Sequence, residues 1–343
     1  MIERLHVTPA QLDLISPGRR DYWVGLAHDT LWAEWWVPLT VFVGPEARDG
    51  EGLVAFGSTH GNEYEGPVAI KHLLHEITLD RVRGRIVLVP VLNPAAFRDG
   101  TRDGRGVNLN RAFVEDAGRS PALASITYRL AGLVREQIWP HVNVVLDLHS
   151  GGDVMRFALV SSLHETPNRE QNARAIETAR WFGTPFVMVY QNEYPGLLTS
   201  ESEKLGKTTV GTELGWGCAV NEDGVAYGRQ GILGAAVAHG FLDLEIEPIA
   251  HHRDGTQRLV DISRPSCAVY APWQGSYEPV TPCGTAVREG DILGFVHDFD
   301  RIDEQPWPAR ASVDGHVICQ AWTARVVAGQ QIAMVGLELP WPS

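Results

Sequence analysis

A histidine and a glutamate stand three residues apart at one turn of the sequence, and this pair limits the fold more than any other feature. Residues 53–56 form a short apolar run that is typical of a buried strand, and small residues follow it before His60 and Glu63. A helix-forming stretch begins directly afterwards. We therefore expect an imidazole and a carboxylate side by side at the carboxyl end of a strand. Both groups are good zinc ligands, and a catalytic zinc typically takes three protein ligands.

A third ligand follows a second apolar run. Residues 142–148 are strand-like and lead into His149, after which come a serine and two glycines. Ligands collect where the strands of a parallel sheet end, so neighbouring strands would bring His60, Glu63 and His149 into one crevice. Asp147 is placed to orient the ring of His149. The sequence thus predicts one zinc ion per chain, and the alternative is that these are ordinary capping and buried polar side chains.

Composition and charge exclude several classes of protein. The chain has 343 residues, which suits one large domain with a smaller one. A net charge of −13 argues against nucleic acid or an anionic membrane as a partner, because both need a basic surface. No apolar run approaches the ~20 residues of a membrane helix. The four cysteines have no CxxC spacing and the N-terminus lacks a signal segment, so we expect a cytoplasmic protein.

The order of the apolar patterns predicts an α/β fold followed by an all-β unit. Strand-like and helix-like stretches alternate through most of residues 1–250, and residues 1–45 read as antiparallel strands at the edge of the sheet. The segment 95–106 reads as a polar, glycine-studded loop. From 256 to 343 the chain changes to short β-runs separated by glycines. We therefore expect a catalytic domain over 1–250 and a β-domain over 256–343.

Several motifs occur together in an order that resembles a known family. The His-x-x-Glu turn is followed by Asn-Leu-Asn-Arg-Ala-Phe at 108–113 and by Asp-Leu-His-Ser at 147–150. This order resembles the succinylglutamate desuccinylase and aspartoacylase family of zinc amidohydrolases, which is similar to the zinc carboxypeptidases. The resemblance implies a mixed sheet flanked by helices. The tail resembles the biotinyl/lipoyl-type barrel of that family, but no lysine follows Lys207, so we expect an unmodified lid or assembly module.

The resemblance also implies roles for individual residues. Glu213, in a Glu-apolar-Gly setting on an expected strand, matches the carboxylate that serves as general base and acid. Arg111, with Asn110 beside it, matches the arginine that binds the substrate carboxylate. Arg102 matches the arginine that polarises the scissile carbonyl, although Arg105 competes for this role. The alternatives are a structural glutamate paired with an arginine, and solvated arginines.

The predicted function is zinc-dependent hydrolysis of the amide bond of an N-acyl amino acid. Residues 60–67 and the long tail most resemble the bacterial branch that includes the deacetylase of N-acetyl-diaminobutyrate. A carboxypeptidase acting on short peptides stays open, and an open cleft would favour it. A catalytically weak binding protein of the same fold is the other alternative. The sequence leaves the acyl group undefined, and homo-oligomerisation also stays open.

Overall fold

The computed structural model describes residues 4–27, 33–104, 107–117, 119, 125–191 and 194–342. Its α-helices are α1 (Glu65–Glu76), α2 (Pro94–Asp99), α3 (Ile126–Leu133), α4 (Arg169–Arg180), α5 (Leu198–Lys204), α6 (Glu222–Ala238) and α7 (Ala250–Arg253). Its strands up to residue 213 are β1 (Arg4–Val7), β2 (Gly18–Ala27), β3 (Glu34–Val43), β4 (Leu53–Gly57), β5 (Arg85–Val89), β6 (Val144–Leu148), β7 (Met155–Phe157), β8 (Val160–His164), β9 (Phe186–Tyr190) and β10 (Thr208–Glu213). The later strands are β11 (Arg258–Asp261), β12 (Ala268–Tyr270), β13 (Gly275–Pro279), β14 (Ala286–Val287), β15 (Ile292–His297), β16 (Trp307–Arg310), β17 (Gly315–Ala321), β18 (Arg325–Val326) and β19 (Gln331–Leu339).

A large mixed sheet runs through the molecule in the order β1-β2-β3-β5-β4-β6-β10-β8-β9-β11-β19-β17-β14. Its centre is parallel, since β4 pairs in parallel with both β5 and β6, and β6 with β10. Every residue of β4, β5 and β6 is buried, which explains why these strands are continuous apolar runs. Strand β8 is antiparallel to β10 but parallel to β9.

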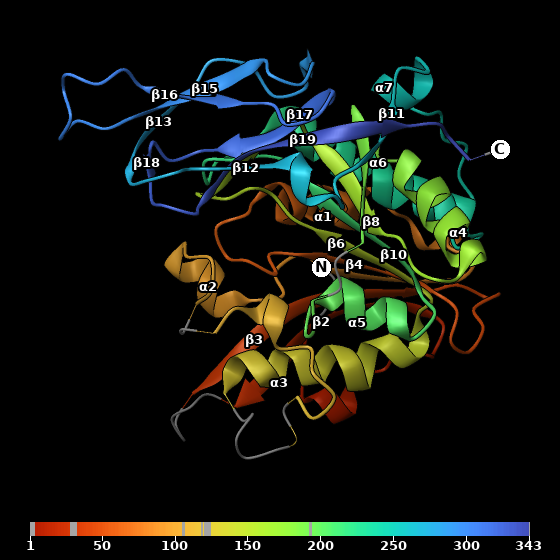
Figure 1. Ribbon diagram of the computed structural model, residues 1–343. Helices are drawn as coiled ribbons and strands as arrows, with labels where there is room; N and C mark the ends of the chain where they lie inside the picture. Colours follow the sequence, from red (N-terminus) through yellow and green to blue (C-terminus); the bar gives the residue numbers. More distant parts are fainter. Residues whose placement is uncertain are drawn as a thin grey trace.

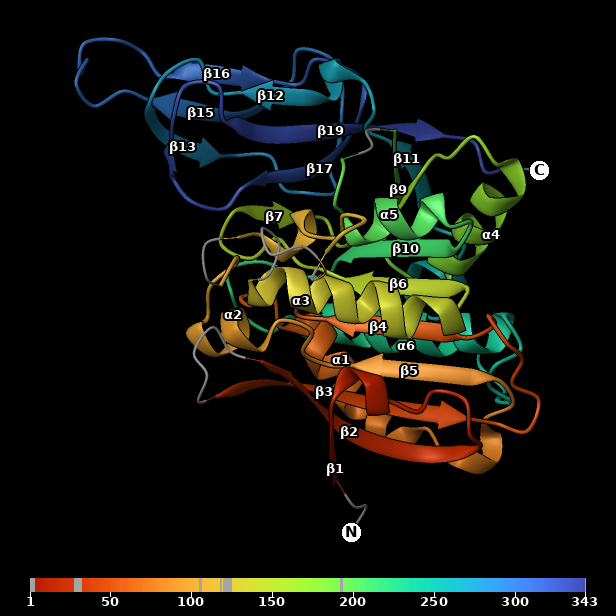
Figure 2. The ribbon, with the colours of Figure 1, turned by 90° about the horizontal axis from the view of Figure 1, so that it is seen from below.

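Helices cover both faces of the sheet (Figures 1 and 2). On one face, α1, α4 and α6 pack together over the central strands and bury one hydrophobic cluster. On the other face, α3 packs against β2 and buries a second cluster. The parallel centre is therefore enclosed, and its strand ends are the places where polar side chains can gather.

The C-terminal segment adds a β-structure that shares the main sheet. Strand β11 pairs with β9 on one side and with β19 on the other, so the sheet continues into the tail (Figure 2). A separate antiparallel sheet, β16-β15-β13-β18, shares a hydrophobic cluster with β12, β17 and β19. The predicted fold, an α/β sheet with a C-terminal β-domain, is confirmed. The division into a domain over 1–250 and a domain over 256–343 stays a prediction. The pairing of β9 with β11 shows that one sheet includes strands from both ranges.

One local expectation is corrected. The segment 95–106 is not all loop, because α2 occupies Pro94–Asp99, with the side chain of Asn93 accepting from the amide of Ala96. Helix α3 is followed directly by one turn of π-helix over Val134–Ile138. Among the residues that the structure describes, no helix is both long and apolar enough to cross a bilayer.

Candidate active site

The turn between β4 and α1 places the first two candidate ligands. His60 and Glu63 are 3% and 2% exposed, so both are withdrawn from solvent. The turn is tight against α2, because a Cβ at Gly61 would lie 2.0 Å from the carbonyl carbon of Ala96. Glycine is therefore required between the two ligands, and its presence lets the imidazole and the carboxylate face the same side.

Strand β6 supplies the third candidate ligand. Phe56 pairs with Asp147 and Gly57 with Leu148, so β4 and β6 end side by side and His149 follows directly. The candidate ligand atoms of His60, Glu63 and His149 all lie within 4.8 Å of one another. The structure thus brings the predicted triad together as a buried set that is able to bind a metal ion.

The two imidazole rings present the same nitrogen to the centre of the triad. Nδ1 of His60 lies 2.9 Å from Oε1 of Glu63, and Nδ1 of His149 lies 2.9 Å from its Oε2. Nε2 of His149 lies 2.8 Å from Oδ2 of Asp147, while Nε2 of His60 lies 3.2 Å from Oδ1 of Asn108. Outer partners that hold Nε2 are what orients a metal-binding histidine, so the donor set fits a zinc ion.

Asp147 and Glu63 are themselves held in place. The hydroxyl of Thr59 donates to Oδ1 of Asp147 at 2.7 Å, and the amide of Ser150 donates to Oε2 of Glu63 at 3.0 Å. Burial opposes the ionisation of Glu63, but the charges of His60 and His149 outweigh it and hold the pKa of Glu63 well below its usual range. The centre therefore keeps a carboxylate ionised in spite of its burial.

Glu213 lies at the end of β10, beside the triad. Gly211 pairs with Asp147 in the parallel ladder, and the amide of Leu214 donates to the carbonyl of His149 at 2.9 Å, so Glu213 stands next to His149. Its Oε2 is buried and has no hydrogen-bond partner among the described residues. Burial, followed by the charge of Glu63, raises the pKa of Glu213 to about 8. This carboxyl group can hold or release a proton near neutral pH.

The segment that follows α2 reaches the same centre. Nη1 of Arg102 donates to Oε1 of Glu63 at 2.8 Å. Nδ2 of Asn110 lies 3.2 Å from Nε2 of His149, and its Oδ1 accepts from the amide of Leu198 at 2.8 Å. Arg111 is exposed, donates to the carbonyl of Asn110 and lies 5.8 Å from the ring centre of Tyr194. Arg105, the alternative to Arg102, lies outside the described residues.

A cavity of about 480 Å³ opens beside His149 and Glu213. Asn110 lines it, whereas Arg111 only borders it through Tyr194. Its wall includes Arg264, Tyr270, Gln331 and Met334, from the segment after β11 and from β12 and β19. The roles of these residues were not predicted. No signal in the sequence pointed to Arg264, because β11 runs parallel to β9 and β8 but opposite to β10, so the rule for the ends of parallel strands does not place it.

Comparisons with known proteins agree with this geometry. Residues 49–238, more than half of the chain, match the succinylglutamate desuccinylase/aspartoacylase catalytic domain. The chain is 31% identical over 312 residues to N-alpha-acetyl-L-2,4-diaminobutyric acid deacetylase of Halomonas elongata, covering 90% of this chain and 87% of that protein. Aspartoacylase of Danio rerio is 26% identical over 175 residues, which are 49% of this chain and 55% of that protein.

Solved structures extend the likeness over nearly the whole chain. Succinylglutamatedesuccinylase/aspartoacylase from Rhodobacter sphaeroides superposes with a TM-score of 0.88 at 26% identity, covering 96% of this chain and 98% of that one. The product-bound ectoine utilization protein EutE (DoeB) from Ruegeria pomeroyi has a TM-score of 0.85 at 27% identity, covering 95% and 98%. The matched region holds the whole buried triad. The chain therefore belongs to the succinylglutamate desuccinylase/aspartoacylase family of metal-dependent deacylases.

Proposed function

We propose that this protein is a zinc-dependent deacylase that hydrolyses the amide bond of an N-acyl amino acid. The observation that carries the proposal is the carboxyl group of Glu213, whose Oε2 is buried without a hydrogen-bond partner among the described residues, beside the His60, Glu63 and His149 triad. Amide hydrolysis needs an activated water and a proton donor for the leaving amine. The triad would hold the metal that activates the water, and Glu213 can give a proton to the leaving amine.

His60, Glu63 and His149 are the residues that would hold zinc. A bound zinc ion supplies a Lewis acid that lowers the pKa of a water toward ~7. Asp147 and Asn108 fix the two imidazole rings from behind through their Nε2 atoms. The chain thus sets the orientation of both histidines before any ligand arrives, which limits the reorganisation needed on binding.

Glu213 is the proposed general base and general acid. With a pKa raised to about 8, its carboxyl group exchanges a proton readily near neutral pH. It takes a proton from the attacking water and later gives one to the leaving nitrogen. Arg102, whose guanidinium lies 2.8 Å from Glu63, is the proposed donor to the scissile carbonyl and to the oxyanion that develops there.

The substrate carboxylate is proposed to bind through arginine and amide groups around the cavity. Asn110 lines the cavity and Arg111 borders it, as the family resemblance implies. Arg264 adds a guanidinium from the opposite wall, and no carboxylate pairs with it among the described residues. A guanidinium binds a carboxylate in a fixed, bidentate geometry. These groups suit the charged end of an amino acid.

The C-terminal wall of the cavity favours a small substrate over a peptide. Tyr270, Gln331 and Met334 close one side of a space of about 480 Å³. A carboxypeptidase would need an open cleft for the rest of its peptide. An N-acetyl amino acid is the first candidate, because the Halomonas elongata relative is a deacetylase by name and is 31% identical over 90% of this chain.

Release of free amine from N-acetyl, N-succinyl and N-formyl amino acids and from a short peptide tests the proposal. We expect zinc-loaded protein to release amine from one N-acyl amino acid, and Glu213→Gln to lose this activity while keeping its zinc. The matched control is Glu76→Gln, because Glu76 is exposed and pairs with Arg229 on the protein surface. Cleavage of the peptide alone would replace the proposal with a carboxypeptidase, and near-normal turnover by Glu213→Gln would remove the role of that residue.

A further inference from the structure

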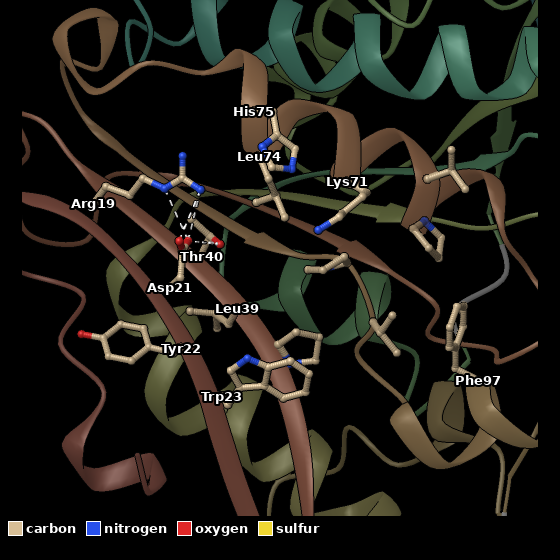
Figure 3. Close-up of a pocket in the computed structure, with 15 residues that line it drawn as sticks. Arg19, Asp21, Tyr22, Trp23, Leu39, Thr40, Lys71, Leu74, His75 and Phe97 are labelled. Atoms are coloured by element: carbon tan, nitrogen blue, oxygen red, sulfur yellow. Dashed lines mark hydrogen bonds and ion pairs between the residues drawn. The ribbon is translucent and has the colours of Figure 1, made fainter. Parts of the chain in front are cut away.

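A second and larger hollow is lined by residues of β2 and β3, near one edge of the main sheet, and Figure 3 shows the side chains around it. It has a volume of about 1210 Å³ and lies between β2 and β3 on one side and α1 with the segment 90–97 on the other. It shares no lining residue with the cavity beside Glu213. Nothing in the proposed reaction uses it.

The hollow arises from the way α1 covers the sheet. Helix α1 packs over β4 and β5, whereas β2 and β3 extend past it. Because Trp23 pairs with Pro38 and Asp21 with Thr40 in the antiparallel ladder, these side chains lie on one face of the two strands. Trp23 and Pro38 are both half-buried. This face of β2 and β3 forms the floor of the hollow, and α1 and α2 contribute its walls.

The walls are mainly apolar. Trp23 and Pro38 from the floor, Val68 from α1 and Phe97 from α2 contribute ring and aliphatic surface. Phe97 is fixed from behind by Tyr64, whose ring centre lies 5.5 Å away at a steep angle. Small-molecule sites are lined in this way, by apolar surface with a few polar groups that set orientation.

The polar groups of the hollow leave an uncompensated positive charge. Asp21 accepts from the hydroxyl of Thr40 at 2.7 Å and from Arg19 at 3.4 Å, so its charge is already matched. Figure 3 shows the ammonium of Lys71 pointing into the hollow from α1. No hydrogen bond or ion pair of that ammonium occurs within the described part of the chain.

Lys71 differs in this respect from the two other lysines of the chain. The ammonium of Lys204 lies 2.9 Å from a carboxylate oxygen of Glu201. The ammonium of Lys207 donates to the carbonyls of Trp139 and Val142. In a protein with a net charge of −13, a lysine without a carboxylate partner at the rim of an apolar hollow is a local attraction for an anion.

From this geometry we propose that the hollow is a second ligand site for a small amphipathic anion, with an apolar body and one carboxylate or sulfonate. The body lies against Trp23, Pro38 and Phe97, and the anionic group pairs with Lys71. The aromatic and proline rings can bury an apolar body that makes no hydrogen bonds, while the ammonium favours an anionic ligand over a neutral one. The ligand would contact Val68 in the first turn of α1.

Anilinonaphthalene sulfonate is a direct probe, since it joins an aromatic body to one anionic group. Its binding to the zinc-loaded full chain is measured by fluorescence titration, and neutral N-phenylnaphthylamine serves as the uncharged counterpart. Because Lys71 is exposed, we expect saturable binding of the sulfonate at one site and about two- to fivefold weaker binding in Lys71→Gln, as for loss of one exposed ion pair. The neutral probe should bind wild type and Lys71→Gln equally.

Three further variants locate the probe. Val68→Phe fills the hollow from α1 and should weaken both probes, whereas Lys204→Gln and Arg264→Gln remove cations elsewhere and should leave the Kd unchanged. Unchanged sulfonate binding in Lys71→Gln or Val68→Phe would overturn the proposal. So would the absence of saturable binding to wild type, or a loss of binding in Arg264→Gln, which would place the probe in the cavity beside Glu213. None of these results bears on the deacylase reaction, so the two proposals fail separately.

Discussion

The two hollows of this protein differ in volume and in the charged groups that they contain, and the smaller hollow has the stronger electrostatics. The cavity beside His149 is the smaller, about 480 Å³ against about 1210 Å³ for the hollow under α1. Yet the small cavity is lined by Glu213, whose Oε2 is buried and has no hydrogen-bond partner among the described residues, and by His149, which contacts the buried carboxylates of Glu63 and Asp147. In the large hollow the carboxylate of Asp21 is half-buried and paired.

This difference teaches that volume and chemistry are separate properties of a hollow. Desolvation shifts a pKa and strengthens electrostatic interactions, so buried titratable groups mark the place where bonds can be broken. A large, apolar and weakly charged hollow can bind a molecule, but it lacks the buried titratable groups that would catalyse a reaction of that molecule. The predictions below test this separation, beginning with the largest expected effect.

His149→Ala should abolish both zinc binding and turnover. The substitution removes one of three ligands and also leaves Asp147 without the ring that it holds at 2.8 Å. Metal content by atomic absorption and amine release measure the two losses. His72→Ala, an exposed residue of α1, is the control and should keep both. Retained turnover with full metal in His149→Ala would end the assignment of the triad.

Glu213→Gln should keep zinc and lower kcat by about 10²–10⁴-fold, the usual contribution of a general acid-base group. The side chain keeps its size but can no longer accept the proton. Steady-state kinetics and metal analysis of the same preparation separate the two effects. A drop in metal content together with kcat would show that Glu213 supports the metal centre and does not act as a base.

Asp147→Asn should weaken zinc affinity by about 10–100-fold and leave the fold intact, since residues that orient metal ligands have effects of this size. The hydrogen bond from Thr59 to Oδ1 can persist while the charge facing His149 is lost. Competition with a chelator measures the affinity. Wild-type affinity in this variant would mean that the ring of His149 is fixed by Asn110 alone.

Arg264→Gln should raise KM by about tenfold and change kcat little, because the guanidinium is expected to bind the substrate carboxylate and not the reacting atoms. Arg253→Gln, which breaks an exposed contact with Asp254, is the matched control. An unchanged KM would leave carboxylate binding to Asn110 and Arg111. A large fall in kcat at constant KM would place Arg264 at the reacting carbonyl.

A last prediction concerns stability without metal. The pKa of Glu213 is raised from 4.5 to about 8 in the folded protein, so between these values the folded state keeps a proton that the unfolded state has released. The free energy of unfolding should therefore fall as pH rises through this range. Glu213→Gln should lose this part of the dependence, and a pH-independent difference in Tm between the two proteins would contradict the raised pKa.

The buried triad that is able to bind a metal could be predicted from the sequence because its parts lie in short segments. His60 and Glu63 share one turn, and Asp147 and His149 share one strand end, so two local patterns and the rule for parallel strands place all four. The segment 95–106 was read as a loop, although Asn93 before Pro94 is a signal for a helix start. The structure has α2 there.

The cavity wall could not be predicted in the same way. Tyr270 and Met334 belong to strands far along the chain, and they reach the cavity only through strand pairings that have no local signal. The reversal of β8 between β10 and β9 is equally hidden, since its five residues are all buried and read like those of a parallel strand. Order within a sheet is decided by packing between distant segments.

The pairing of β19 with β11 has a consequence for how the chain is made. β19 begins at Gln331. During synthesis, the edge of β11 that pairs with β19 therefore stays unpaired until more than 60 further residues have left the ribosome. An unpaired strand edge next to an apolar core is prone to associate with other chains. A stop codon before β19 would thus be expected to yield aggregated protein, even though every proposed metal ligand lies upstream of it.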